Sequence, residues 1–397
     1  MSEFDDIVQQ MAGRSFHRIV PVASLPSPTF SCDGREIVSF SSNNYLALAS
    51  SRRLIEAGRA ALEKFGVGNC ESRLLGGDLD IYRKLEDKLA RLKGKAAGVL
   101  FATGYLTNLG VLSMLPSCSK IARIYGYRPT KHYSYAYFTD ECNHISIREG
   151  IRASGADKIT YRHCDLNHLA DKLAASSANM KIIVSDGVFS QDGDIVPLPD
   201  MLALAERHDA LVYIDDAHAT GVLGPNGGGT TDHFNVNSDR LICMGTLSKA
   251  YGAIGGFIAT DTTLAQIIRL SCSAYGFTST LPPDQAYAVC EAMDAVLDEP
   301  QRRQRLWENQ RYFVTEIDKL SLPLISRQTC IVPVLLGAED RCEQVSAKLF
   351  EHGFHVDSVI FPAVPRGQGR LRFIMNANHT REQLDGLLAA LRELMAS

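Results

Sequence analysis

The 397-residue sequence lacks a strong excess of charge of either sign and lacks long apolar runs. It has 41 Lys and Arg against 45 Asp and Glu, a formal net charge of −4, so the broad basic face of a nucleic-acid-binding protein is not expected. No segment approaches the roughly 20 apolar residues of a membrane-spanning helix. The first residues, MSEFDDIVQQ, carry acids where a secretion signal carries basic residues and then an apolar block. A cytoplasmic protein is therefore the favoured interpretation.

Closely spaced cysteine pairs, internal repeats and low-complexity stretches are also missing. The ten cysteines are scattered singly, and none forms a C-x-x-C pair. A chain of this length does not need a disulfide framework, so we interpret most of them as small buried apolar residues that stay reduced.

Amphipathic helices alternate with short apolar strands over most of the chain. Helical spacing of apolar residues occurs at residues 52–65, 81–92 and 201–208. The strand-like runs are GVLFA (98–102), KIIVSD (181–186), LVYIDD (211–216) and LICMGT (241–246). These runs are apolar on both faces, as buried parallel strands are. The pattern predicts an α/β fold with a large, doubly wound, mostly parallel sheet.

Three regions are expected along the chain. Residues 1–45 form an N-terminal arm, with a short strand at 36–40, that packs with the small domain. Residues 46–290 form the large domain. Residues 291–397 form a smaller α+β C-terminal domain, entered through a long helical region at about 284–320. This last region contains the strand CIVPVLL, a helix at 342–352, the strand RLRFIM and a terminal helix from Thr380.

Polar residues follow several predicted strands, where ligands bind in open α/β sheets. After GVLFA come Thr103, Gly104 and Tyr105, which open a helix and can present backbone N–H groups to an anion. Alone, this feature is better interpreted as a plain turn.

A second motif, LVYIDD, ends in Asp215 and Asp216, and His218 follows two residues later. A buried carboxylate there can bond a protonated ring nitrogen, whereas the alternative is a helix cap for one Asp and a surface position for the other.

LICMGT leads into a glycine-rich turn that contains Lys249. Partial burial lowers the pKa of such a lysine and favours Schiff-base chemistry. Thr246 and Ser248 can donate hydroxyl groups to a phosphate beside it. KIIVSD runs on to Ser190, and His144 in DECNH could stack on a flat ring, although a lone histidine more often has a structural role. Together these residues match what pyridoxal phosphate requires: a lysine, a carboxylate, a phosphate cup and a flat lid.

An ordered set of motifs along nearly the whole chain then resembles the α-oxoamine synthase family of fold-type I pyridoxal-5′-phosphate-dependent transferases. The motifs are SSNNYLAL, SRLLGG, FATGYLTN, NHISIREG, DGVFSQDGD, DDAHATGVLG, GTLSKAYG, FTSTLPP and RLRFIMNANHT. The ordered set is highly specific, although each motif alone is not.

The resemblance implies roles for the catalytic residues. Lys249 would form the Schiff base with the cofactor and later move the α-proton of the amino acid. Asp215 would pair with the pyridinium nitrogen, and His218 would contact the 3-hydroxyl group of the ring. His144 would stack over the ring, and Ser190 would lie beside it.

The same resemblance implies the phosphate, substrate and subunit contacts. Thr103, Gly104, Tyr105, Thr246 and Ser248 would hold the phosphate, and no metal ion is expected in the site. Arg372, helped by Asn43, would bind the carboxylate of the amino acid. The segment around Thr278 would reach the cofactor of the neighbouring subunit, which implies a homodimer with shared active sites.

The implied reaction condenses glycine, alanine or serine with an acyl thioester of CoA or a carrier protein, loses CO₂ and gives an α-amino ketone. The sequence does not select the amino acid, the acyl chain or the donor.

An aminotransferase of the same fold and a non-catalytic partner subunit are the alternative functions. A dinucleotide-binding protein is weaker, because GVLGPNGGG lacks G-x-G-x-x-G spacing. The segment 118–137, rich in Tyr and basic residues, either shapes the acyl entrance or meets a phosphopantetheine-bearing partner, or is a solvated surface insertion.

Overall fold

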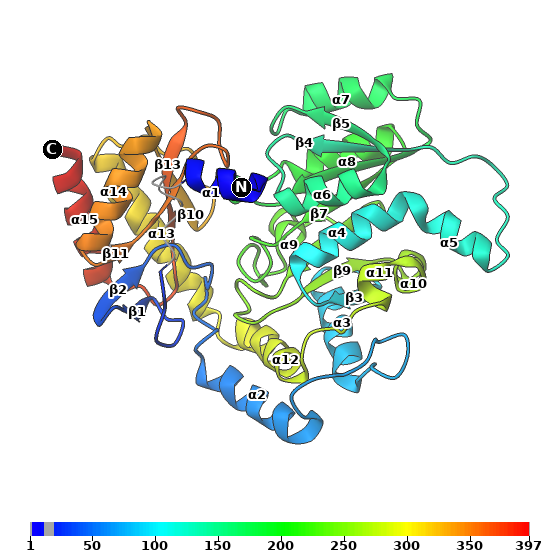
Figure 1. Ribbon diagram of the computed structural model, residues 1–397, viewed down its shortest axis with the longest axis horizontal. Helices are drawn as coiled ribbons and strands as arrows, with labels where there is room; N and C mark the ends of the chain where they lie inside the picture. Colours follow the sequence, from blue (N-terminus) through cyan, green and yellow to red (C-terminus); the bar gives the residue numbers. More distant parts are fainter. Residues whose placement is uncertain (1, 12–19, 397) are drawn as a thin grey trace.

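A seven-stranded sheet with helices on both faces dominates the computed structural model, which describes residues 2–11 and 20–396 (Figure 1). The strand order is β3-β9-β8-β7-β6-β4-β5, and β9 alone runs antiparallel to its two neighbours. The strands are β3 (Ala97–Phe101), β4 (Tyr135–Asp140), β5 (Asp157–Tyr161), β6 (Met180–Asp186), β7 (Ala210–Asp215), β8 (Leu241–Thr246) and β9 (Gly256–Thr260). The predicted doubly wound, mostly parallel sheet is confirmed.

Successive side chains of the central strands pack into two different cores, because they point to opposite faces of the sheet. On β6, Ile183 packs in one core, and Ile182 and Val184 pack in the other. The first core is closed by α3 (Asp80–Leu92), α7 (Leu166–Ala175), α8 (Leu198–Arg207) and α12 (Pro283–Asp298). The second core is closed by α4 (Gly104–Met114), α6 (Ile145–Ser154) and α10 (Thr262–Ser271).

A smaller unit joins the C-terminal part of the chain to strands near the N-terminus (Figure 1, left). It contains two three-stranded sheets, with the orders β10-β13-β12 and β1-β2-β11. In the second sheet, β2 pairs in parallel with β11, so segments from opposite ends of the sequence lie side by side. The elements are β1 (Thr29–Cys32), β2 (Arg35–Ser39), α13 (Gln301–Lys319), β10 (Ile331–Gly337), α14 (Glu339–Glu351), β11 (Phe354–His355), β12 (Asp357–Val359), β13 (Gly369–Ile374) and α15 (Arg381–Ala396).

The long helical region expected at about 284–320 is two helices. It is interrupted between α12 and α13 at Glu299 and Pro300. Proline has no N–H group to continue a helix and disfavours helical geometry at the residue before it, and Glu299 accordingly has φ −117° and ψ 59°.

The segment 118–137 is only partly an insertion. It starts as α5 (Cys118–Ile124), directly after the short 3₁₀ turn η1 (Leu115–Ser117), and its last three residues belong to β4. Tyr137 is fully buried in the core beside α4, so a solvated surface position is wrong for this end of the segment.

The remaining described elements are α1 (Glu3–Met11), α2 (Arg52–Phe65), α9 (Thr230–Phe234) and α11 (Ser273–Gly276). The division of the chain at residues 45 and 290 stays a prediction, and residues 1 and 12–19 of the expected arm lie outside the described residues. Within residues 2–11 and 20–396, no helix combines the length and apolar character needed to span a bilayer.

Candidate active site

A pocket of about 270 Å³ opens where β6, β7 and β8 end and α4 begins. Parallel strands bring their carboxyl ends to one edge of a sheet, which gathers residues that are far apart in the sequence. Ten residues named from the sequence line this pocket: Thr103, Gly104, Tyr105, His144, Ser190, Asp215, His218, Thr246, Ser248 and Lys249.

Lys249 lies in the turn after β8, with its amine among charged groups. Burial is the largest influence on this amine and lowers its pKa to about 8, although Asp215 and Asp186 act in the opposite direction. A substantial fraction of the amine is therefore unprotonated near neutral pH, and an unprotonated amine can act as a nucleophile or a base.

Asp215, the last residue of β7, is buried and held by two donors. Asn108 Nδ2 donates to its Oδ2 at 2.6 Å, and the backbone N–H of Ala217 donates to its Oδ1 at 3.0 Å. Asn108 is itself fixed, because its Oδ1 accepts from the Tyr213 hydroxyl at 2.8 Å. The carboxylate thus has a set orientation within the pocket.

A second carboxyl group, Asp186, lies beside Asp215 at the same edge. The two are register partners on β6 and β7. Burial, and then the nearby Asp215, raise the pKa of Asp186 well above its usual range. Asp186 is therefore protonated more readily than an exposed aspartate.

Asp216 has a structural role and does not occupy the surface position considered for one of the two acids. It is buried, and its carboxylate lies 2.6 Å from Lys93 Nζ. It also accepts from the backbone N–H and the hydroxyl of Thr230, at 3.0 and 2.8 Å. A buried ion pair of this kind fixes the turn that follows β7.

The N-terminus of α4 lies against Thr246, the last residue of β8, and the two form a cup that could bind an anion. Thr103 caps the helix, since its Oγ1 accepts from the Leu106 N–H at 3.1 Å. Thr246 Oγ1 lies 2.8 Å from Ser248 Oγ, opposite this helix end. A Cβ atom on Gly104 would lie 3.1 Å from Thr246 Oγ1 and 3.2 Å from Met244 Cε, so the two elements approach each other closely at this glycine.

His144 precedes α6 and is held against the pocket wall. Its backbone N–H donates to Asp186 Oδ2 at 3.0 Å, and its Nδ1 lies 2.7 Å from Ser146 Oγ. Burial lowers the pKa of His144, so the ring is neutral at pH 7. Tyr105 stands edge-on to this ring, with 6.5 Å between the ring centroids.

Asn43 is joined to the pocket through Tyr45. The Tyr45 hydroxyl lies 2.6 Å from His218 Nδ1 and donates to Asn43 Oδ1 at 3.3 Å. Burial, and then the charge of Lys249, lower the pKa of His218 well below its usual range. His218 is therefore uncharged.

Arg372 on β13 approaches from the smaller unit. Its Nη1 donates to the backbone oxygen of Ser190 at 3.3 Å, and its Nη2 lies 3.1 Å from Asp357 Oδ2. Its Nε is buried and has no hydrogen-bond partner among the described residues. An unpaired buried donor next to Ser190 is suited to a ligand carboxylate.

Thr278 does not line this pocket among the described residues. It borders a separate groove of about 480 Å³ with Leu106, Gly110 and Phe277, and the Phe277 side chain is largely exposed. The expectation that this segment reaches a neighbouring subunit stays a prediction.

Two important residues were missed from the sequence. Asn108 lies one helical turn after Gly104 in the motif FATGYLTN, and Asp186 ends KIIVSD just as Asp215 nearly ends LVYIDD. Both signals were present: i+4 spacing on one helix face, and an acid at the end of a buried strand. Ser146, Val188, Ala217 and Met244 also line the pocket.

The arrangement fits pyridoxal phosphate. Lys249 can hold its aldehyde carbon, Asp215 its ring nitrogen, and the cup around Gly104 its phosphate, while His144 provides the flat wall. A plain turn would not need the close packing at Gly104, and a helix cap would not need the Asp215 carboxylate to be oriented by Asn108.

Comparisons with known proteins agree with this geometry. The family model for class I and II aminotransferases matches residues 35–391. The chain is 38% identical to 8-amino-7-oxononanoate synthase 1 of Bacillus velezensis, over 99% of this chain and 98% of that protein. It is 39% identical to the Bacillus subtilis protein of the same name, over 94% and 92% of the two chains. The chain belongs to the α-oxoamine synthase family.

Solved structures give the same family assignment. Serine palmitoyltransferase of Sphingomonas wittichii superposes with a TM-score of 0.90 at 27% identity, over 100% of this chain and 98% of that chain. The 8-amino-7-oxononanoate synthase of Francisella tularensis superposes with a TM-score of 0.76 at 26% identity, over 91% and 98%. The α-oxoamine synthase described here is therefore a fold-type I, pyridoxal phosphate-dependent acyltransferase that forms an α-amino ketone from an amino acid and an acyl thioester.

Proposed function

We propose that this synthase uses alanine as its amino acid and releases CO₂ as it joins alanine to an acyl thioester. In the product named by the similar Bacillus proteins, the amino group is on carbon 8, next to a terminal methyl carbon and a ketone carbon. Alanine without its carboxylate supplies this methyl and amino-bearing carbon. Identity over nearly the full length of both chains supports extending the same amino acid to this enzyme.

The observation that carries the proposed condensation, as distinct from the choice of alanine, is the pairing of Lys249 with a spare carboxylate-binding donor at the pocket edge. When bound, pyridoxal phosphate supplies an electron sink for the carbon next to the amino group. The Lys249 amine, with a pKa near 8, can take the proton from that carbon. Asp215, oriented by Asn108, would hold the proton on the ring nitrogen.

Arg372 and Asn43 are the proposed carboxylate-binding residues. The unpaired Nε of Arg372 can donate to one carboxylate oxygen, and its guanidinium is already oriented by Ser190 and Asp357. His144 and His218, both uncharged because they are buried, would contact the ring without repelling its protons.

The proposal includes a homodimer with shared active sites and a cytoplasmic location. The exposed Phe277 beside Thr278 supports a subunit contact at that groove. The ten cysteines are all free in the structure, which is compatible with a reducing compartment.

Thiol release from acyl thioesters, measured with glycine, alanine and serine in turn, tests the function. We expect turnover with alanine, accompanied by one CO₂ for each thiol released. Equal turnover with serine would contradict the choice of alanine. Exchange of amino groups with a keto acid, without thiol release, would favour the aminotransferase alternative.

A further inference from the structure

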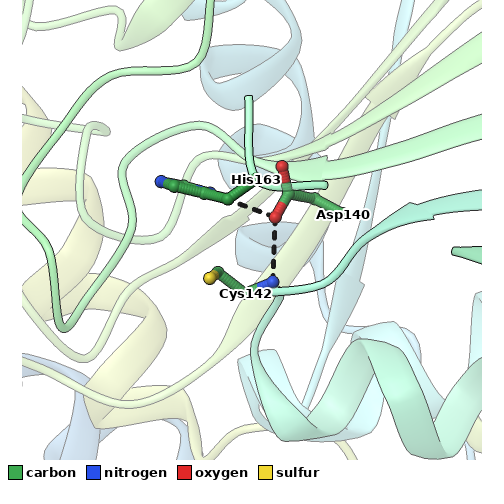
Figure 2. A group of neighbouring side chains, drawn as sticks. All are labelled: Asp140, Cys142 and His163. Carbon is green, nitrogen blue, oxygen red and sulfur yellow. Dashed lines mark hydrogen bonds and ion pairs between the residues drawn. The ribbon is translucent and has the colours of Figure 1, made fainter. Parts of the chain in front are cut away.

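We propose that Asp140, Cys142 and His163 form a binding site for Zn²⁺ next to the cofactor pocket. Asp140 ends β4, Cys142 lies in the turn before α6, and His163 follows β5, so the fold brings together three segments. One ligand atom from each side chain lies within 4.8 Å of the others. Figure 2 shows Asp140 next to both other residues, with the Cys142 sulfur on the same side as the imidazole.

The ligand types and spacing suit a borderline ion with tetrahedral geometry. A thiolate, an imidazole and a carboxylate are preferred by Zn²⁺, whereas Mg²⁺ and Ca²⁺ prefer oxygen ligands alone. His163 Nδ1 lies 3.1 Å from Asp140 Oδ1. Two ligands at about 2.1 Å from one Zn²⁺ are roughly 3.4 Å apart in a tetrahedron, so the pair needs to move by only a few tenths of an ångström.

Neighbouring groups hold two of these ligands as metal ligands are usually held. His163 Nε2 lies 3.0 Å from Asp194 Oδ2, an interaction that orients the ring with Nδ1 toward Asp140. Asp140 Oδ2 accepts from the backbone N–H of Cys164 at 2.8 Å. The imidazole also packs edge-on against Phe189, with 4.4 Å between centroids. The ring therefore has a fixed position on both sides.

His163 lies between two carboxyl groups. Its Nδ1 lies 3.1 Å from Asp140 Oδ1, and its Nε2 lies 3.0 Å from Asp194 Oδ2. Zn²⁺ binds cysteine as the thiolate, so the thiol proton passes to the solvent when the ion binds, and no oxidant or reductant is involved.

The cluster is separate from the cofactor pocket but lies next to two segments that line it. None of the three residues lines the pocket among the described residues. Cys142 precedes His144 by two residues, and Phe189, which contacts His163, precedes Ser190. A bound ion would fix the turn that carries His144 relative to the loop that carries Ser190.

Titration of the cofactor-loaded enzyme with ZnCl₂ in a calorimeter, without amino acid, tests the site. We expect binding of one Zn²⁺ per chain. CoCl₂ should give a thiolate-to-cobalt charge-transfer band in the near-ultraviolet difference spectrum. Because these readouts are independent of turnover, they do not depend on the proposed reaction.

Cys142→Ser should weaken Zn²⁺ binding at least about tenfold and remove the cobalt–thiolate band. Cys70→Ser, which changes another exposed cysteine far along the chain, is the matched control and should leave both unchanged. Absence of binding by the unchanged protein would overturn the proposal. Zn²⁺ binding that survives Cys142→Ser but is lost in Cys164→Ser would place the ion between His163, Cys164 and Asp194. That result would also overturn the proposal.

Discussion

Lys249 shares its pocket with two buried carboxyl groups, and their influences on its amine oppose that of burial. Burial dominates, so the pKa falls to about 8, whereas the carboxyl groups keep it from falling further. Burial, and then the nearby Asp215, raise the pKa of Asp186. The environment of the pocket thus makes the lysine, Lys249, more readily unprotonated and the aspartate, Asp186, more readily protonated than these residue types usually are.

The pKa of Lys249 predicts how the apoprotein takes up pyridoxal phosphate as pH changes. Bond formation with the aldehyde needs the unprotonated amine, and this fraction rises as pH rises through about 8. The uptake rate, followed by visible absorbance, should therefore increase with pH and level off above that value. Lys158→Ala, at an exposed lysine, should keep the same profile. A rate that falls with rising pH would contradict the assignment.

Asn108→Ala tests whether Asn108 positions Asp215. The change removes a donor at 2.6 Å and leaves the Tyr213 hydroxyl without its acceptor, so unfolding should become easier by about 1–3 kcal/mol. We also expect kcat to fall more than about tenfold, with little change in KM for the amino acid. Loss of stability with unchanged kcat would show a purely structural role.

At the scale of elements, the carboxyl ends of several strands could be predicted from the sequence. Each of these buried strands is a short apolar run, and polar residues follow it directly. The ends of β7 and β8, which carry Asp215 and Lys249, were predictable in this way. β4, β5 and β9 were not named, because their sequences mix polar and apolar residues or contain glycine. The break at Pro300 was also missed, since apolar spacing continues on both sides of it.

The N-terminus of α4 provides a prediction at this scale. In Gly104→Ala, the new methyl group would lie 3.1 Å from Thr246 Oγ1 and would push the helix end away from the cup. We expect the Kd for pyridoxal phosphate to rise about tenfold or more, measured by absorbance titration. Gly68→Ala is a matched control, because nothing lies within 4 Å of its Cβ position. Equal affinity in the two variants would contradict the phosphate cup.

At the scale of the whole molecule, the site depends on parts that only the fold brings together. Tyr45 from the N-terminal part contacts His218 of the large sheet, and Arg372 from the smaller unit contacts Ser190. The sequence suggested Asn43 and Arg372 through the family resemblance alone, since no spacing rule links residues more than 300 positions apart. The unpaired Arg372 Nε and the carboxylate pair could be seen only in three dimensions.

Shared active sites predict complementation between two inactive variants. Lys249→Ala disables its own site, and Thr278→Arg should disable the site of the neighbouring subunit. A mixed dimer would then hold one intact site, so coexpression should restore up to about a quarter of the normal activity. Activity that stays at the level of the separate variants would contradict shared sites.

The central claim is that Lys249 carries the cofactor. Borohydride reduction of the cofactor-loaded enzyme, followed by mass spectrometry of its peptides, tests this directly. The account predicts a phosphopyridoxyl group on the peptide that contains Lys249 and no stable attachment elsewhere. Attachment to a different lysine, or to none, would contradict it.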